Sequence, residues 1–238
     1  MNSPSLAIEA RGLCRRYGRR WALVDVDLQV PTGAAVLVAG RNGSGKSTLL
    51  RVLSTAIRPD RGQVLVDGLD SREARAEVRK RIAILGHATY TYDGLTALQN
   101  LEVTAAMGGF PRKNGELTAL LERVGLAHRA HDEVHTFSAG MRKRLSLART
   151  LLQDAQVVLL DEPYNQLDTN GFLLVDGVLE SLKAQGKTVL LVSHLLERGA
   201  AFCDLGVVLE EGRVHWTGPA RDLPESGGLE AARIPEAV

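Results

Sequence analysis

Short apolar runs alternate with helix-like periodicity along most of the chain. Unbroken apolar runs at residues 34–39, 157–160 and 188–192 are typical of strands buried on both faces of a parallel sheet. Helical patterns occur at residues 48–56 and 172–184, and the alternation of strand and helix predicts an α/β fold with a mainly parallel sheet. Further strands are expected at residues 6–18, 21–30, 63–66, 82–85, 205–209 and 213–216, and a further helix at residues 72–81.

A different pattern fills the middle of the chain. Strand signals stop, and leucine-rich helical periodicity takes over at residues 95–107, 116–124 and 140–152. This stretch predicts an α-helical subdomain inserted into the α/β core. We expect a single domain over residues 1–238, with a core of residues 1–87 and 155–219, a helical subdomain of residues 88–154 and a tail of residues 220–238.

Composition narrows the classes of partner. The 238 residues are 45% hydrophobic, which is enough for a packed core. The 29 Lys and Arg residues nearly balance the 28 Asp and Glu residues, and this argues against nucleic acid as a partner. Apolar runs fall short of the ~18 residues of a membrane-spanning helix, so we expect any membrane role to come through a partner. Cys14 and Cys203 have no metal-binding spacing and imply no disulfide framework.

Residues 40–47 match the pattern G-x-x-x-x-G-K-[ST] of a phosphate-binding loop, between a predicted strand and a predicted helix. Glycines allow backbone N–H groups to surround phosphates, and the helix N-terminus adds a favourable dipole. We expect Lys46 to reach the β- and γ-phosphates, Ser47 to bind Mg²⁺ and Thr48 to contact the α-phosphate. With ATP and Mg²⁺ as cofactors, the predicted binding residues are Gly40, Asn42, Gly43, Ser44, Gly45, Lys46, Ser47 and Thr48.

Two later strands end in polar residues that suit the metal and water side of such a site. The strand at residues 157–160 runs into Asp161 and Glu162, and the strand at residues 188–192 is followed by one serine and His194. The carboxyl ends of parallel strands meet at the ligand-binding edge of a sheet. Asp161 is therefore a candidate Mg²⁺ ligand, and Glu162 a candidate general base for the attacking water. We expect His194 to contact the γ-phosphate and to orient that water.

A short motif ahead of a basic helix identifies the class. Its sequence at residues 137–141, F-S-A-G-M, resembles the LSGGQ signature of ABC ATPases. Together with the phosphate-binding loop, it makes the chain similar to the ATP-binding subunits of ABC transporters over about residues 6–219. The resemblance implies that Ser138 and Gly140 face the nucleotide bound by a second copy, so that two ATP molecules lie between two chains. It also implies that Tyr17 stacks on adenine.

Two departures from the usual pattern refine that resemblance. The N-Q-L-D sequence at residues 165–168 resembles the D-loop, with Asp168 in place and with Asn165 and Gln166 where smaller residues are usual. His87 stands where most ABC ATPases have a glutamine that meets Mg²⁺ and the attacking water. The resemblance implies that His87 takes the role of that glutamine, because a neutral imidazole can be a metal ligand or a hydrogen-bond partner.

The stretch that contains His87 narrows the resemblance further. Its L-G-H sequence at residues 85–87, with L-T-A-L-x-N-L at residues 95–101, is similar to the CcmA-like ATPases of cytochrome c maturation. That similarity implies an ATPase coupled to a haem-handling exporter, with integral membrane partners like CcmB and CcmC. It also implies a peripheral position on the cytoplasmic side of the inner membrane, where Tyr90 and Tyr92 lie in the region that meets the permease.

Two alternatives stay open. One is an ABC exporter ATPase for another cargo, such as a drug, lipid or peptide. The other is a soluble ABC protein that acts mechanically on ribosomes or DNA. The single ATPase domain, the lack of sustained heptads and the net charge of +1 disfavour the soluble class.

Overall fold

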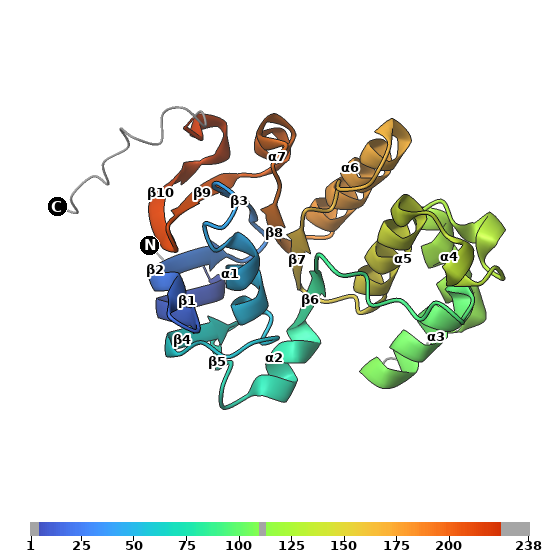
Figure 1. Cartoon of the computed structure of the whole chain (residues 1–238), viewed down its shortest axis with the longest axis horizontal. Coiled ribbons are helices and arrows are strands. Elements are labelled where there is room, and N and C mark those ends of the chain that lie inside the picture. The colour runs from blue at the N-terminus through green and yellow to red at the C-terminus, as the bar shows by residue number, and fades with distance from the viewer. Residues whose placement is uncertain (1–4, 110–112, 225–238) are drawn as a thin grey trace.

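The computed structural model describes residues 5–109 and 113–224, which form two β-sheets and the helices that cover them (Figure 1). The larger sheet has six strands in the order β10-β9-β3-β8-β7-β6, and all neighbours in it are parallel except β10 and β9. Its strands are β3 (Ala35–Ala39), β6 (Ile82–Leu85), β7 (Val157–Asp161), β8 (Thr188–Val192), β9 (Leu205–Glu210) and β10 (Arg213–Pro219). The predicted α/β fold with a mainly parallel sheet is confirmed.

The two faces of the larger sheet carry separate halves of the core. Every residue of β3, β7 and β8 is buried, which explains why these runs show no polar face. Successive side chains of a strand point to opposite faces. Leu37 therefore packs with α5 (Ala139–Leu152) and α6 (Thr169–Ala184), whereas Val36 packs with α1 (Lys46–Leu53) and the smaller sheet.

The smaller sheet is antiparallel and lies on the α1 side of the core. Its strands follow the order β2-β1-β4-β5, with β1 (Leu6–Tyr17), β2 (Arg20–Pro31), β4 (Arg61–Val66) and β5 (Leu69–Asp70). β1 and β2 form a long hairpin that pairs Tyr17 with Arg20 next to its turn. The tip of this hairpin thus carries an aromatic ring and a guanidinium group towards one end of the sheet.

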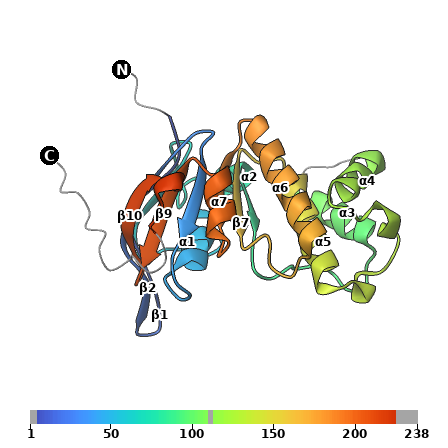
Figure 2. The same cartoon turned by 90° about the horizontal axis from the view of Figure 1, so that it is seen from above.

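A group of helices lies at the other end of the molecule. α3 (Ala97–Gly108), α4 (Asn114–Arg123) and α5 pack together, and α6 lies between them and the sheets in both views (Figure 1, Figure 2). Thr96 begins α3 with a capping box, in which its Oγ1 accepts a hydrogen bond from the N–H of Gln99 (3.2 Å). None of the helices in residues 5–109 and 113–224 combines the length and apolarity needed to cross a lipid bilayer.

Local contacts move some element boundaries from those predicted. The helix expected at residues 72–81 is α2 (Arg75–Arg81), which begins later because Asp70 accepts a hydrogen bond from the N–H of Arg72 (2.7 Å) and holds a turn there. The helix expected at residues 48–56 is α1, which begins at Lys46. Two short elements, β5 and α7 (Leu196–Phe202), were not predicted, because their patterns are too short to stand out from loops.

The predicted tail begins with a packed turn. A 3₁₀ turn, η3 (Ala220–Asp222), contacts β9 and α7, and Ala220 is buried. This first part of the tail is therefore part of the folded core. The remainder of the predicted tail, from residue 225 on, lies outside the described residues.

Candidate nucleotide-binding site

The loop between β3 and α1 has a backbone path that suits glycine alone. Gly40 has a φ of 140° and Gly45 a φ of 108°, a region that side chains avoid. A Cβ atom at Gly40 would clash with the carbonyl oxygen of Leu209, and one at Gly45 would clash with that of Ala22. The glycines therefore let the loop pass tightly between β9 of the larger sheet and β2 of the smaller one.

Lys46 folds its side chain back over this loop. Its Nζ donates hydrogen bonds to the carbonyl oxygens of Gly40 (2.6 Å) and Arg41 (2.9 Å). Burial lowers the pKa of Lys46, while the nearby carboxylates of Glu162 and Asp161 act in the opposite direction. The loop thus holds a partly desolvated ammonium group, for which phosphate oxygens are stronger partners than carbonyls.

The hydroxyl of Ser44, also in this loop, lacks a hydrogen-bond partner among the described residues. Ser44 is buried, and its Oγ makes no hydrogen bond to any residue that the structure describes. It lies 2.8 Å from the position a Cβ would take at Gly40. An orphaned hydroxyl beside a glycine-lined loop and a lysine fits a polyphosphate, since buried polar groups are normally hydrogen-bonded.

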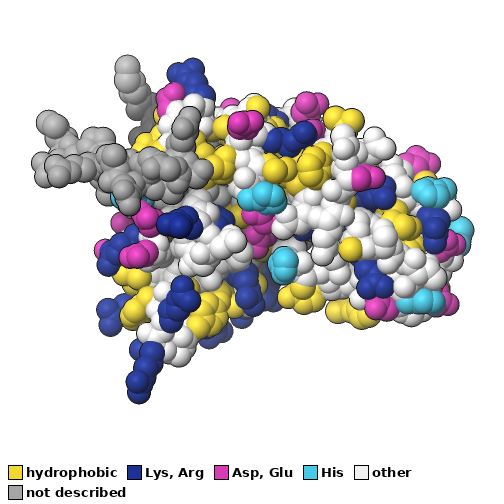
Figure 3. Space-filling view, turned by 45° about the horizontal axis from the view of Figure 1, so that its top comes forward, with side chains coloured by type: hydrophobic (Ala, Val, Ile, Leu, Met, Phe, Trp, Pro, Cys, Tyr) yellow, Lys and Arg dark blue, Asp and Glu magenta, His cyan; other side chains and the backbone are white. Residues whose placement is uncertain are grey.

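A pocket of about 350 Å³ opens above the loop. Tyr17 is 44% exposed at its edge, so part of its ring remains accessible to a planar base beside the Arg15 guanidinium, which lies 5.1 Å from the ring centroid. Acidic and histidine side chains lie together near the middle of this face of the molecule (Figure 3). The loop, the hairpin tip and the ends of β7 and β8 supply the lining, which consists of Tyr17, Arg20, Ala22, Asn42, Gly43, Gly45, Lys46, Ser47, Thr48, Asp161, Glu162 and Val192.

The carboxylates predicted for the metal and the water lie at the rim of this pocket. Asp161 is buried at the end of β7, and Glu162 follows it with a left-handed backbone (φ 49°). The N–H of Glu162 donates to the carbonyl oxygen of Val192 (2.9 Å). Its Oε2 lies 2.8 Å from Nδ1 of His194 and also accepts a hydrogen bond from the His194 backbone N–H (3.3 Å). The structure thus brings Glu162 and His194 into direct contact.

Lys143 is a buried cation that the sequence patterns did not identify. It projects from α5, is 4% exposed, and donates from Nζ to the carbonyl oxygen of Asp161 (3.3 Å). Burial lowers the pKa of Lys143, and the carboxylates of Asp161 and Glu162 oppose that effect. The two carboxylates therefore lie between Lys46 on the loop side and Lys143 on the α5 side. No local signal marks Lys143, because the contact joins two elements across the fold.

Arg20 is a second residue of the site that the motifs did not identify. Its guanidinium NH2 lies 3.5 Å from the position a Cβ would take at Gly43, and the side chain lines the pocket. Within residues 5–109 and 113–224 it makes no hydrogen bond or ion pair. The Arg-rich turn at residues 15–20 is the only sequence signal, and that signal is typical of any exposed hairpin.

His87 lies in a neighbouring cavity of about 600 Å³ rather than in the pocket above the loop. Ser47 and Asp161 line both spaces. The cavity of His87 thus adjoins the two predicted Mg²⁺ ligands. Glu162 and His194 do not line this cavity.

The remaining predicted residues, Ser138, Gly140 and Asp168, lie apart from the pocket. Ser138 caps α5, where its Oγ accepts a hydrogen bond from the N–H of Met141 (3.2 Å), and Asp168 caps α6 in the same way (2.8 Å). A Cβ at Gly140 would lie 2.8 Å from the carbonyl oxygen of Gln166. The starts of the two helices therefore pack against each other, on a part of the surface that this chain's own pocket does not reach.

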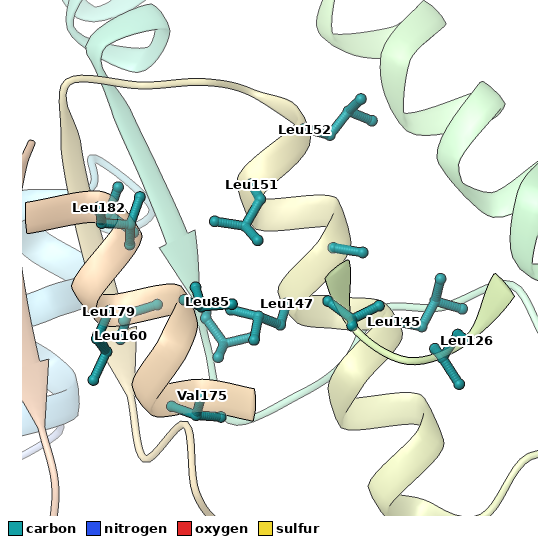
Figure 4. Packing of buried hydrophobic residues seen from close by; sticks show 14 of the residues in the cluster. Leu85, Leu126, Leu145, Leu147, Leu151, Leu152, Leu160, Val175, Leu179 and Leu182 are labelled. Carbon is teal, nitrogen blue, oxygen red and sulfur yellow. The ribbon is translucent and has the colours of Figure 1, made fainter. Parts of the chain in front are cut away.

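The helix that carries Ser138 is fixed to the core by apolar packing. Leu147 and Leu151 of α5 belong to one buried cluster with Leu85 of β6 and Leu179 of α6 (Figure 4). A buried leucine contributes roughly 1.5–3 kcal/mol. The position of the α5 start relative to β7 is consequently set by a continuous core.

The fold and the pocket together define a P-loop nucleotide-binding protein. The family model described as ABC transporter matches residues 23–165, which contain the phosphate-binding loop, the signature motif and both carboxylates. The chain therefore belongs to the ABC transporter family, and it is an ATP-binding, ATP-hydrolysing subunit of that family.

Curated relatives and solved structures agree with this assignment. The chain is 35% identical over 208 residues to the ABC transporter ATP-binding protein NatA of Bacillus subtilis (strain 168), covering 86% of this chain and 85% of NatA. It is 42% identical over 226 residues to the daunorubicin resistance ATP-binding protein DrrA3 of Streptomyces coeruleorubidus, covering 93% of this chain and 71% of DrrA3. A solved structure of an ATP binding subunit of an ABC transporter matches with a TM-score of 0.83 at 27% identity, covering 95% of each chain.

Proposed function

We propose that the chain powers a membrane exporter by hydrolysing ATP in the pocket above its phosphate-binding loop. The contact between Glu162 and His194 at the rim of that pocket carries the proposal. A carboxylate held by an imidazole beside a phosphate-binding loop is suited to take a proton from an attacking water. The two carboxylates, with Lys46 in the pocket and the buried Lys143 beside Asp161, make the site suited to a charged transition state.

The nucleotide is expected to lie between Tyr17 and the loop. The exposed ring of Tyr17 would stack on adenine, while Lys46 would exchange the carbonyls of Gly40 and Arg41 for the β- and γ-phosphates. Backbone N–H groups and hydroxyls of the loop would bind the remaining phosphate oxygens. The residues proposed for these contacts are Gly40, Asn42, Gly43, Ser44, Gly45, Ser47 and Thr48.

Ser47 and Asp161 are proposed to hold Mg²⁺. Their positions fit such an ion, because both line the pocket and both also border the cavity of His87. Mg²⁺ commonly takes few protein ligands and keeps waters and phosphate oxygens as the rest. When bound, the ion neutralises phosphate charge and orients the γ-phosphate. His87 is proposed to contact the same ion from its own cavity, as a ligand or as a hydrogen-bond partner.

Hydrolysis then requires a water in line with the bond between the γ-phosphorus and its bridging oxygen. Glu162 takes the proton of that water, the water oxygen bonds to phosphorus, and the bridging oxygen leaves with ADP. His194 holds the carboxylate of Glu162 in place and faces the γ-phosphate. ATP and water are thus converted into ADP and phosphate, with one proton accepted by Glu162.

A second copy of the chain is proposed to complete the site. Ser138 and Gly140 lie at the start of α5, outside this chain's own pocket, with Asp168 beside them. A helix start of this kind suits an anion. In an ATP-sandwich dimer these residues would face the nucleotide on the partner. The solved dimeric ATP-binding cassette with bound ADP and Pi (24% identity, TM-score 0.81) has the same fold.

An integral membrane permease is the other proposed partner. Tyr90 and Met107 are 75% and 76% exposed, and Tyr90 lines the cavity that holds His87. Large exposed apolar side chains beside a hollow are typical of a protein–protein contact. We propose that a permease contacts this region and places the chain on the cytoplasmic side of the membrane as a peripheral subunit.

Haem handling in cytochrome c maturation is the cargo role that we propose first. The support is the resemblance of residues 82–101 to CcmA-like ATPases, which implies permease subunits like CcmB and CcmC. The relatives reported above carry other names, and DrrA3 is named for daunorubicin resistance. An exporter of a drug is therefore the second candidate, supported by that 42% identity.

The catalytic assignment is tested with Glu162→Gln. Loss of the general base is expected to reduce MgATP turnover by about 10²–10⁴-fold, while ATP binding is retained. Glu180→Gln serves as the control, because Glu180 is an exposed carboxylate on α6 outside the pocket. Turnover of Glu162→Gln at the wild-type rate would show that another group activates the water.

The same Glu162→Gln chain tests the cargo. It is loaded with MgATP, purified from detergent-solubilised native membranes, and examined for partners and for visible absorption. Multi-span partners with a haem Soret band support the cytochrome c maturation role. Multi-span partners that bind daunorubicin and contain no haem support the drug exporter instead. Recovery of the chain without any membrane protein contradicts both.

A further inference from the structure

Tyr164 is buried two residues after Glu162, in the loop that joins β7 to α6. It is 2% exposed, and its hydroxyl donates a hydrogen bond to Oδ1 of Asp176 on α6 (2.8 Å). Burial, together with Asp176, raises the pKa of Tyr164, so the hydroxyl keeps its proton and remains the donor. A tyrosine this deep is anchored at both its ring and its hydroxyl.

Asp176 is shared with a cation from α7. Arg198 forms an ion pair with Oδ2 of Asp176. Its guanidinium lies 5.7 Å from the ring centroid of Tyr164 and 5.3 Å from that of Phe172, and the two rings meet edge to face at 5.4 Å. These distances are typical of favourable cation–π and aromatic pairs. We call Tyr164, Phe172, Asp176 and Arg198 the aromatic bridge.

The aromatic bridge joins the two chain segments that carry the catalytic pair. Tyr164 follows Glu162 in one segment, and α7 with Arg198 follows His194 in the other. In the first segment, Glu162 and Gln166 both have left-handed backbones (φ 49° and 68°). Such conformations cost roughly 1–3 kcal/mol each and persist only where the surroundings fix them. In the sequence, Tyr164 with its buried ring lies between these two residues.

We propose that the aromatic bridge holds Glu162 against His194 in the geometry that activates water. The proposal rests on the function proposed above for Glu162 and His194. None of the four residues lines the nucleotide pocket. Tyr164, Asp176 and Arg198 are therefore positioning residues. They affect kcat for ATP hydrolysis rather than the affinity for nucleotide.

A role in core packing alone makes a different prediction. The side chains of Asp176 and Arg198 are 28% and 38% exposed, and ion pairs with that exposure contribute little to folding. Under packing alone, loss of the tyrosine hydroxyl lowers stability and leaves kcat in the remaining folded protein unchanged. Under positioning, the same change lowers kcat and leaves KM for ATP unchanged.

Tyr164→Phe is the first test, because it keeps the buried ring and removes only the hydroxyl. We expect kcat for MgATP to fall about tenfold, equivalent to roughly 1.4 kcal/mol, with KM and ADP affinity unchanged. The matched control is Tyr92→Phe, because the hydroxyl of Tyr92 has one hydrogen bond within the described residues, a weak one to Sδ of Met107 (3.7 Å). Wild-type kcat in folded Tyr164→Phe would overturn the proposal.

The Glu162→Gln background shows which residue the bridge acts through. If the bridge positions Glu162, adding Tyr164→Phe to Glu162→Gln causes no further loss of the residual turnover. A further tenfold loss would mean that the bridge acts on another step, and would overturn the proposal. This comparison is separate from the catalytic assignment, which Glu162→Gln alone decides.

Hydrogen exchange tests the bridge without any turnover. The N–H of Glu162 donates to the carbonyl oxygen of Val192, so its exchange reports opening of the loop that Tyr164 anchors. We expect Tyr164→Phe and Arg198→Met to speed this exchange at least tenfold, with the amides of β3 unaffected. Unchanged protection of the Glu162 amide in both variants would contradict the proposal, whatever the ATPase rate.

Discussion

Arg20 extends the nucleotide pocket beyond the residues that follow the loop motif. It lines the same pocket as Lys46 and brings a second cation close to Gly43. An exposed guanidinium near a phosphate is worth about 1 kcal/mol, because water screens most of the attraction. Its effect on nucleotide affinity is therefore expected to be measurable but modest.

Arg20→Ala is expected to weaken ATP and ADP binding by roughly fivefold each, with kcat at saturating ATP unchanged. The reason is that Arg20 lies beside Gly43 of the phosphate-binding loop and makes no contact with the Glu162–His194 pair among the described residues. Titration with a fluorescent nucleotide measures both affinities. Arg19→Ala is the control, since its side chain does not line the pocket. Equal losses in both variants would assign the effect to overall charge on the hairpin.

Residues in fixed-spacing motifs were predictable, and residues that meet across the fold were not. Lys46, Ser47 and Glu162 follow strands and a loop whose order in the chain sets their positions. Lys143 reaches Asp161 from a different element, and no spacing in the sequence records that contact. The prediction for His87 was limited in the same way. The resemblance implied a contact with Mg²⁺ and the attacking water, but it did not indicate the separate cavity that His87 lines.

At the scale of elements, a half-buried arginine of α5 adds polar contacts to its apolar packing. Nε of Arg149 donates to Oγ1 of Thr104 on α3 (2.9 Å), and its NH1 donates to the carbonyl oxygens of Thr89 (2.9 Å) and Tyr90. The segment that follows His87 is thereby attached to α5 and α3. The position of His87 consequently depends on a helix far from it in the sequence.

Arg149→Met is expected to lower the free energy of unfolding by about 1–3 kcal/mol, because the partly buried Thr104 hydroxyl and Thr89 carbonyl oxygen lose their donor. Urea unfolding followed by circular dichroism measures the change. Arg123→Met is a suitable comparison, since Arg123 makes one exposed hydrogen bond to Ser181 (3.3 Å) and should shift stability by less than about 0.5 kcal/mol. A loss as large in Arg123→Met would mean that arginine side chains on this surface act through general charge.

The helices and strands that were predicted best are those whose sequence is most constrained by burial. β3, β7 and β8 are buried throughout, so their apolar runs left no other interpretation. α2 was predicted too long, because a side-chain turn at Asp70 competes with the first turn of the helix. α7 is set by its contacts with β3 and η3, which a local pattern does not record.

At the scale of the whole molecule, one chain carries one part of each of two active sites. Lys46 lies in the pocket, and Ser138 lies on a part of the surface that this pocket does not reach. If two copies exchange these halves, each active site needs Lys46 from one chain and Ser138 from the other. Two defective chains can then restore one intact site between them.

A mixture of Lys46→Ala and Ser138→Asp chains is expected to recover ATPase activity that neither variant has alone. Ser138→Asp keeps an N-cap for α5 while placing a negative charge where a phosphate is proposed to lie. Steady-state ATPase assays over a range of mixing ratios measure the recovery, and a mixture of Lys46→Ala with Lys46→Arg serves as the control. Absence of recovery, with dimers present by light scattering, would assign Ser138 to its own chain's nucleotide.

The left-handed backbone of Glu162 sets selection for stability against selection for activity. Glycine and asparagine accept such a φ with less strain than glutamate, so either one at residue 162 would give a more stable fold. Selection for thermal endurance alone would therefore remove the carboxylate that is proposed to activate water. A laboratory screen for heat resistance should therefore include an ATPase assay, so that variants without this carboxylate are recognised.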